Sequence, residues 1–127
     1  AVSDGYGDIV KIGGTTGLTA GSMYYLDSDG TWEITNGTDD SEGAKELLAI
    51  ALGTNSDVDG MLLRGFIKVN PAGTQATGAP VYMRASNGAV SYVQNSTSGN
   101  IIRIVGYGLT TNGHIYFNPD STFVEIA

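Results

Sequence analysis

The 127-residue sequence lacks cysteine altogether and holds only six basic residues against thirteen acidic ones. Without cysteine, neither a disulfide framework nor a thiolate metal site can stabilise the fold, so burial and assembly must do so. The net charge of −7 opposes binding to phosphate backbones and to anionic lipid, because the basic residues are scattered along the chain. No apolar run approaches the about 18 residues that a membrane-spanning helix needs. We therefore expect no nucleic-acid partner and no membrane association.

What the sequence has in abundance is glycine and residues that favour strands. Nineteen glycines, seven tyrosines and frequent valine, isoleucine and threonine are typical of many short strands joined by tight turns. The length suits one domain, for which folding removes roughly two-thirds of the extended-chain surface from water. We predict a single all-β domain over residues 8–127, preceded by a polar N-terminal arm over residues 1–7 that orders on a partner.

Alternation of apolar and polar residues places the individual strands. In TWEIT, Trp32 and Ile34 share one face, which is predicted to point into the core. The stretch 61–69 is predicted to be one strand, in which Gly65 marks a bulge or a close backbone approach. Residues 101–105 are apolar on both faces apart from one arginine, as expected of a central strand. Further strands are predicted at 8–12, 22–27, 47–53, 80–85, 89–94, 114–118 and 122–126, which makes about ten in all.

One segment departs from this pattern. Asp39 is suited to cap a helix, with Glu42 three residues later and apolar residues following at helical spacing. Gly43 inside the segment costs about 1 kcal/mol relative to alanine. The prediction is at most one short helix near residues 39–48.

Two parts of the chain resemble each other. The stretch GSMYYLDSDG, which begins at Gly21, returns in outline as GAPVYMRASNG, which begins at Gly78. The alignment brings Tyr25 onto Tyr82, and each copy then reaches an Asp-Gly or Asn-Gly pair, which suits the positive φ of a hairpin turn. We predict a pseudo-repeat of two β units around one core, arranged as a small β-barrel or a β-sandwich.

The acidic turn DSDG could be a calcium loop, a catalytic carboxylate pair or a hairpin bend. An EF-hand loop that starts at Asp27 needs glycine at its sixth position and glutamate at its twelfth. Those positions hold Trp32 and Thr38, so the calcium pattern fails and the hairpin bend is favoured.

The other acids offer a catalytic hypothesis that the sequence does not favour. A carbohydrate-active site needs two carboxyl groups held across a cleft. Asp39, Asp40, Asp57 and Asp59 instead lie in stretches rich in Thr, Ser, Asn and Gly, which are typical of exposed loops. His114, the only histidine, has no Gly-x-Ser-x-Gly motif to serve and cannot build a metal site alone. We predict no catalytic residue, no cofactor and no metal, and therefore a structural or binding role.

Aromatic side chains are the remaining candidates for a binding surface. Their rings give a large contact area with a polar tip, which suits a sugar or a protein partner. Cross-strand packing in a β protein uses the same residue types, so we expect half of them or fewer at an interface. The candidates are Tyr24, Tyr25, Tyr82, Tyr92, Tyr107, Tyr116 and Trp32.

Five motifs span nearly the whole chain: G-x-x-x-Y-L-x-x-D-G (21–30), LLAIALG (47–53), GMLLRGFIKV (60–69), G-x-P-V-Y-M (78–83) and GNIIRIVGYGL…IYFNPDSTFVEI (99–126). Their order and spacing resemble a small β-rich module of tailed-bacteriophage virion proteins. Such modules occur as capsid decoration, or cement, proteins and as domains of head or tail fibres. The resemblance involves no catalytic signature.

The resemblance implies a β-barrel or β-sandwich that assembles as a trimer on the outside of a capsid shell. Our leading hypothesis is a non-enzymatic decoration protein on the outer surface of the virion, a homotrimer whose partner is the major capsid protein and which stabilises the head. A head- or tail-fibre module that binds host-surface glycans is the alternative, although the sequence contains no coiled or repetitive stalk. Because strand faces that mix apolar and charged groups suit a partly buried contact, the predicted interface residues are Arg64, Phe66, Arg84 and Arg103.

Overall fold

A computed structural model shows the chain as strands, turns and bends. The described residues contain no helix, and so none that is long and apolar enough to cross a membrane. The predicted all-β class is confirmed. The residues that the structure describes are 5–6, 8–36, 43, 46–69, 77–83, 88–92, 96–110, 113–120 and 122–126.

In the part of the chain that the structure describes, the first sheet has six strands, all paired antiparallel. In order across the sheet they are β1 (Gly5–Tyr6), β2 (Ile9–Val10), β6 (Met61–Leu62), β5 (Leu48–Ala51), β3 (Met23–Leu26) and β4 (Trp32–Ile34). Every residue of β5 is buried, which explains why that strand is a continuous apolar run and not an alternating one. The predicted arm contributes β1, the part of residues 1–7 that the structure describes.

The second sheet has five strands within the described ranges, again all antiparallel. In order across the sheet they are β7 (Gly65–Lys68), β12 (His114–Phe117), β11 (Ile104–Gly108), β8 (Pro80–Met83) and β9 (Val90–Ser91). A separate ribbon joins β10 (Ile101–Ile102) to β13 (Val124–Glu125). The predicted central position of the strand near residue 105 is confirmed, because β11 has a partner on each side.

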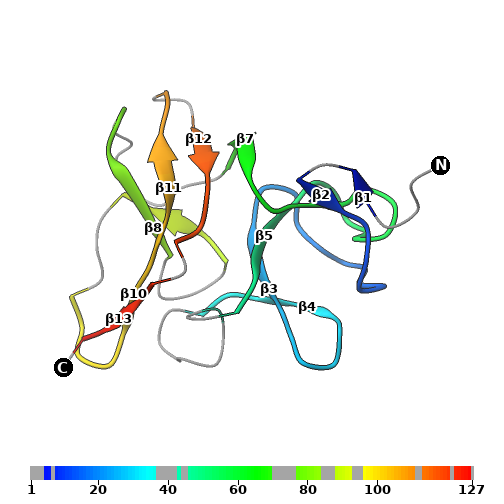
Figure 1. The fold of residues 1–127 in the computed structure, drawn as a ribbon, viewed down its shortest axis with the longest axis horizontal. Coiled ribbons are helices and arrows are strands. Elements are labelled where there is room, and N and C mark those ends of the chain that lie inside the picture. Colours follow the sequence, from blue (N-terminus) through cyan, green and yellow to red (C-terminus); the bar gives the residue numbers. More distant parts are fainter. Residues whose placement is uncertain are drawn as a thin grey trace.

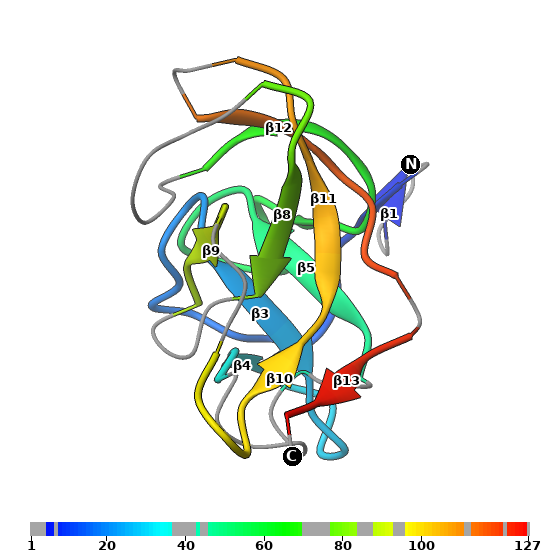
Figure 2. The ribbon, with the colours of Figure 1, turned by 90° about the vertical axis from the view of Figure 1, so that its left-hand side faces the viewer.

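The two sheets lie against each other, with the first on the right and the second on the left in Figure 1. Among the described residues, each sheet keeps two unpaired edges, β1 and β4 in one and β7 and β9 in the other, so the fold is a sandwich and not a closed barrel. In Figure 2, which looks at the molecule from the side of the second sheet, β8 and β11 cross in front of β3 and β5.

Two apolar clusters hold this arrangement. The larger one fills the space between the sheets and includes Met23 and Ile50 from the first sheet and Val81 and Phe117 from the second, all without exposed surface. The smaller one lies on the other side of the first sheet, where Trp32 helps to cover it. The first sheet is therefore buried on both faces. The other residues of the smaller cluster are Leu18, Tyr24, Ala49, Ala51 and Met61.

The two sheets repeat one topology, which confirms the predicted pseudo-repeat. In the first sheet β2 pairs with β6, β6 with β5, β5 with β3 and β3 with β4. In the second, β7, β12, β11, β8 and β9 follow each other in the same way. Even single hydrogen bonds recur, because Gly21 N donates to Ala51 O at 2.9 Å and Gly78 N donates to Gly108 O at 2.7 Å.

The predicted single strand over 61–69 is wrong in one respect. The chain makes two strands there, because β6 ends at Leu62 in the first sheet and β7 begins at Gly65 in the second. Gly65 has a φ of +142°, which residues with a side chain rarely adopt. The glycine therefore marks the point where the chain crosses from one sheet to the other.

Two further predictions meet the structure near β4. Trp32 is buried, but Ile34 is 47 % exposed, so the prediction that both point into the core is wrong for Ile34. β4 is the edge strand of its sheet. The residue after Ile34, Thr35, is the buried one, and its N–H donates to Met23 O. The short helix predicted near residues 39–48 lies largely outside the described residues, and Leu48 at its end begins β5.

The burial pattern yields a stability prediction for a matched pair of valines. Val81→Ala removes two methyl groups from the cluster between the sheets and should lower the free energy of unfolding by about 2 kcal/mol. Val58, which is 66 % exposed, is the control, and Val58→Ala should change it by less than about 0.5 kcal/mol. Urea denaturation followed by circular dichroism measures both. Equal losses in the two variants would contradict the described core.

Candidate functional site

The DSDG stretch forms the bend of the β3–β4 hairpin. Gly30, with a φ of +86°, donates its N–H to Asp27 O at 2.9 Å, and Asp27 N donates to Thr31 O at 2.9 Å. The Asp29 carboxylate accepts from the Thr31 hydroxyl at 2.7 Å and from the Thr31 N–H at 3.0 Å. These two bonds, the hydroxyl first, lower the pKa of Asp29. The acids of this turn therefore serve its geometry.

The loop acids of the catalytic hypothesis also hold main-chain groups. Asp57 Oδ1 accepts from Gly14 N at 3.0 Å, and Asp59 Oδ2 accepts from Asn55 N at 3.1 Å. Asp59 thus stabilises the connection between β5 and β6, and Asp57 ties that connection to the one between β2 and β3. Asp39 and Asp40 lie outside the described residues. Among the residues that are described, no three His, Asp or Glu side chains come together as a potential metal site.

The tryptophan and two of the tyrosines proposed for a binding surface are buried. Trp32 is 2 % exposed, and its indole N–H donates to Ile12 O at 3.0 Å. A Cβ on Gly13 would come within 2.7 Å of the indole, so this packing needs glycine there. Tyr24 and Tyr25 are buried on opposite faces of β3. These three side chains are unavailable to a ligand.

The other tyrosines divide between the interior and one surface. Tyr92 packs against the larger cluster, where burial raises its pKa and its hydroxyl finds no hydrogen-bond partner among the described residues. Tyr107 is 47 % exposed, while Tyr82 and Tyr116 are half-buried. Tyr82, Tyr107 and Tyr116 lie on strands of the second sheet, whereas Tyr92 follows the end of β9.

The outward side of the second sheet presents a row of aromatic residues. Phe66 pairs with Tyr116 across β7 and β12, Tyr116 pairs with Tyr107 on β11, and Tyr107 pairs with Pro80 on β8. Phe66 is 77 % exposed, and its ring centroid lies 5.4 Å from that of Tyr116 at an angle of 47°. Four neighbouring strands thus hold an apolar row in fixed positions, and Figure 2 views the sheet from this side.

Basic groups accompany this row and carboxylates do not. Lys68 and His114 form the next cross-strand pair, and both side chains are exposed. The His114 ring is held by its Nδ1, 3.1 Å from the Thr110 hydroxyl. None of the strands β7, β12, β11 and β8 contains an acidic residue, although the chain has thirteen. We call this surface the aromatic face and define it as Phe66, Lys68, Pro80, Tyr82, Tyr107, His114 and Tyr116.

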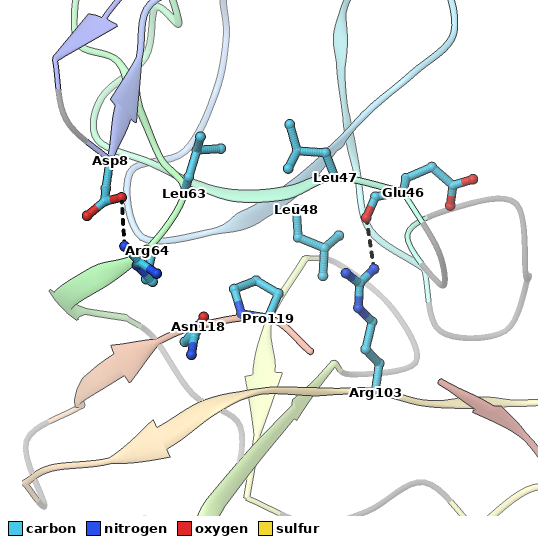
Figure 3. Close-up of a pocket in the computed structure, with 9 residues that line it drawn as sticks. All are labelled: Asp8, Glu46, Leu47, Leu48, Leu63, Arg64, Arg103, Asn118 and Pro119. Carbon is cyan, nitrogen blue, oxygen red and sulfur yellow. Dashed lines mark hydrogen bonds and ion pairs between the residues drawn. The ribbon is translucent and has the colours of Figure 1, made fainter. Parts of the chain in front are cut away.

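A hollow of about 600 Å³ lies where the two sheets meet, beside the β6–β7 crossing. Figure 3 shows Arg64 and Asp8 at one end of it and Arg103 near Glu46 at the other. Arg64 Nη2 lies 3.5 Å from Asp8 Oδ1, in an ion pair that is more than half exposed. Two of the predicted interface residues, Arg64 and Arg103, thus line opposite ends of the same hollow, while Phe66 lies on the aromatic face. The remaining lining residues are Leu47, Leu48, Leu63, Asn118 and Pro119.

Arg103 works inside the protein, which differs from the interface role predicted for it. It is 5 % exposed, and its guanidinium donates to Asp120 O at 2.7 Å, Gly43 O at 2.8 Å and Glu46 O at 2.9 Å. Burial lowers its pKa, and the nearby Glu46 and Asp120 carboxylates oppose that shift. Arg103 thus links the second sheet to the segment before β5. Arg84 lies outside the described residues.

Sequence reasoning named Phe66 as an interface residue and Tyr82, Tyr107 and Tyr116 among the aromatic candidates, but it did not predict that they share one surface. Lys68, Tyr107 and Tyr116 join Phe66 because the strand register places them in adjacent positions. The available signal was the alternation within β7 and β12, where Ile67 and Ile115 point inward and their neighbours outward.

Comparison with known proteins identifies no relative of this chain. No protein-family model, no curated protein and no solved structure matches the sequence. The function of the aromatic face must therefore be inferred from the geometry and chemistry of this chain.

The two arginines of the hollow should differ in their effect on stability. Arg103→Met leaves three main-chain carbonyls without their donor and should lower the free energy of unfolding by about 2–4 kcal/mol. Arg64→Met removes only an exposed ion pair and should change it by less than about 1 kcal/mol. Thermal and urea unfolding of both variants provide the comparison. A neutral Arg103→Met variant would refute the internal role of Arg103.

Proposed function

We propose that this protein is a non-enzymatic decoration protein of a tailed-bacteriophage capsid. It binds the outer shell as a homotrimer, through the major capsid protein, and stabilises the head. The proposal rests on the sequence motifs that resemble virion modules and on one structural observation. That observation is the aromatic face, an exposed apolar row with basic groups beside it, held on a sheet.

The composition of the aromatic face suits a protein partner. Aromatic residues are enriched at protein interfaces, where they supply large contact areas from few rotatable bonds. Burying Phe66 alone would contribute about 1.5–3 kcal/mol. Strands also hold such residues in place before binding, which reduces the entropy lost on association. A solvent-exposed phenylalanine on an ordered strand is therefore best explained by docking.

The charge and size of the chain fit a repeated surface component. A decoration protein holds a shell through many weak contacts repeated by symmetry, so avidity replaces high affinity at each site. The net charge of −7 on a 127-residue chain would keep densely covered particles from associating with one another. Because the described acids of the turns hold main-chain groups, their role in the fold needs no catalytic explanation.

The glycan-binding alternative has less support. Its main candidate, Trp32, is buried, as are Tyr24 and Tyr25. The exposed row includes a phenylalanine, which has no polar group to orient a sugar hydroxyl, and its ring is tilted by 47° from that of Tyr116. Rings that stack on a sugar need a common flat surface, which the tilted rings of Phe66 and Tyr116 do not provide.

A capsid-protection assay tests the proposed function. Purified protein added to assembled capsids that lack it should co-sediment with them at a fixed ratio and raise their disruption temperature. The physical reason is that each bound oligomer bridges neighbouring capsid subunits, which must otherwise separate. Capsids of an unrelated phage are the control. The absence of both binding and protection would contradict the decoration role.

A further inference from the structure

The repeated topology allows residues of the two sheets to be matched strand by strand. In the first sheet, one cross-strand row runs from β2 to β3 through Ile9, Leu62, Ile50 and Met23. Met23 and Ile50 have no exposed surface, Leu62 is buried, and Ile9 packs against the same cluster. This row is therefore the side of the first sheet that the second sheet covers.

The equivalent row of the second sheet is the aromatic row. β7 takes the place of β2, β12 that of β6, β11 that of β5 and β8 that of β3. By register, Phe66 stands for Ile9, Tyr116 for Leu62, Tyr107 for Ile50 and Pro80 for Met23. The two sheets are therefore stacked in the same orientation, with equivalent faces pointing in the same direction. The row that the second sheet covers in the first sheet has no such cover in the second sheet.

The chemistry of the row indicates what covers it. Within the chain, a row at this position packs against another sheet of the same protein. The aromatic face carries Lys68 and His114 and no carboxylate, whereas the described acids outside it include Asp27, Asp29 and Glu33 around the β3–β4 hairpin. A second copy of this chain therefore offers a surface of complementary charge, which favours encounter and fixes orientation.

We propose that the aromatic face is the contact surface for a second copy of the chain. The contact is heterologous, because the complement of a face that carries the Lys68 charge and no carboxylate is the acid-bearing part of the other copy and not the same face. Heterologous contacts that close produce rings such as trimers. The inference rests on the proposed function for its expectation of a homotrimer and deepens it by assigning the aromatic face to the subunit contact, not to the capsid.

Sedimentation equilibrium of the purified chain without capsids tests the inference. The wild type should sediment as a multiple of its 13.2 kDa mass. Phe66→Asp places a charge where the most exposed ring of the aromatic face would be buried, and it should raise the dissociation constant at least about 30-fold. Lys68→Glu should raise it about tenfold, and raising NaCl from about 0.1 M to about 1 M should also weaken the wild-type oligomer.

Val124→Asp is the matched control, because Val124 is also an exposed apolar residue on a strand but lies outside the aromatic face. It should leave the mass unchanged. Circular dichroism should show that all variants remain folded, since each changed side chain is exposed. A wild type that stays monomeric up to about 100 μM would overturn the inference. So would a Phe66→Asp variant with the wild-type mass.

Capsid binding by the same proteins separates this inference from the proposed function. A wild-type oligomer that dissociates on Phe66→Asp but binds no capsid contradicts the decoration role and supports the subunit contact. A Phe66→Asp variant that keeps its mass and loses capsid binding supports the decoration role and overturns the subunit contact. A symmetric contact would be revealed by a wild-type dimer that salt strengthens, which would also overturn the heterologous mode.

Discussion

The structure depends on burying one apolar interior between two sheets that have no covalent link other than the chain itself. The sequence has no cysteine, so the interior must supply the stability that a disulfide framework provides elsewhere. Met23 and Ile50 from one sheet meet Val81 and Phe117 from the other, and none of them has exposed surface. The strands that carry the aromatic face pack on this interior through Val81, Val105, Ile115 and Phe117.

Arg103 shows how polar groups support the same arrangement. Its guanidinium donates hydrogen bonds to main-chain carbonyls of segments far apart in the chain, Gly43 and Glu46 in one segment and Asp120 in another. Buried charges are costly unless every donor is used. In this position the cost is offset by satisfying carbonyls that would otherwise lie beside the interior without partners. Arg103 also lines the hollow where the two sheets meet.

Local patterns predicted most of the fold. Alternation placed nearly all strands, and the Asp-Gly and Asn-Gly pairs together with Gly21 and Gly78 predicted the repeated unit. These features depend on neighbours in sequence, and a strand and its turn are read from about ten residues. The crossing at Gly65 could be read only as an irregularity, because nothing near it states which sheet follows.

The candidate site was harder to predict because it depends on long-range packing. Tyr25 and Tyr82 align in sequence, yet Tyr25 is part of the interior and Tyr82 belongs to the aromatic face. The strand alone cannot decide this, since both of its faces are apolar. The role of Arg103 was hidden for the same reason, because the carbonyl of Gly43 lies 60 residues away along the chain.

The position of Trp32 makes the two outer faces of the sandwich different. Together with Leu18 it seals the far side of the first sheet, much as a terminal repeat seals the end of a solenoid. In this stack of two units, the outer face of the first sheet is covered, whereas the outer face of the second sheet, the aromatic face, is exposed. An engineered third unit could continue the series only from the second sheet, and removal of the tryptophan lid would be the way to open growth in the other direction.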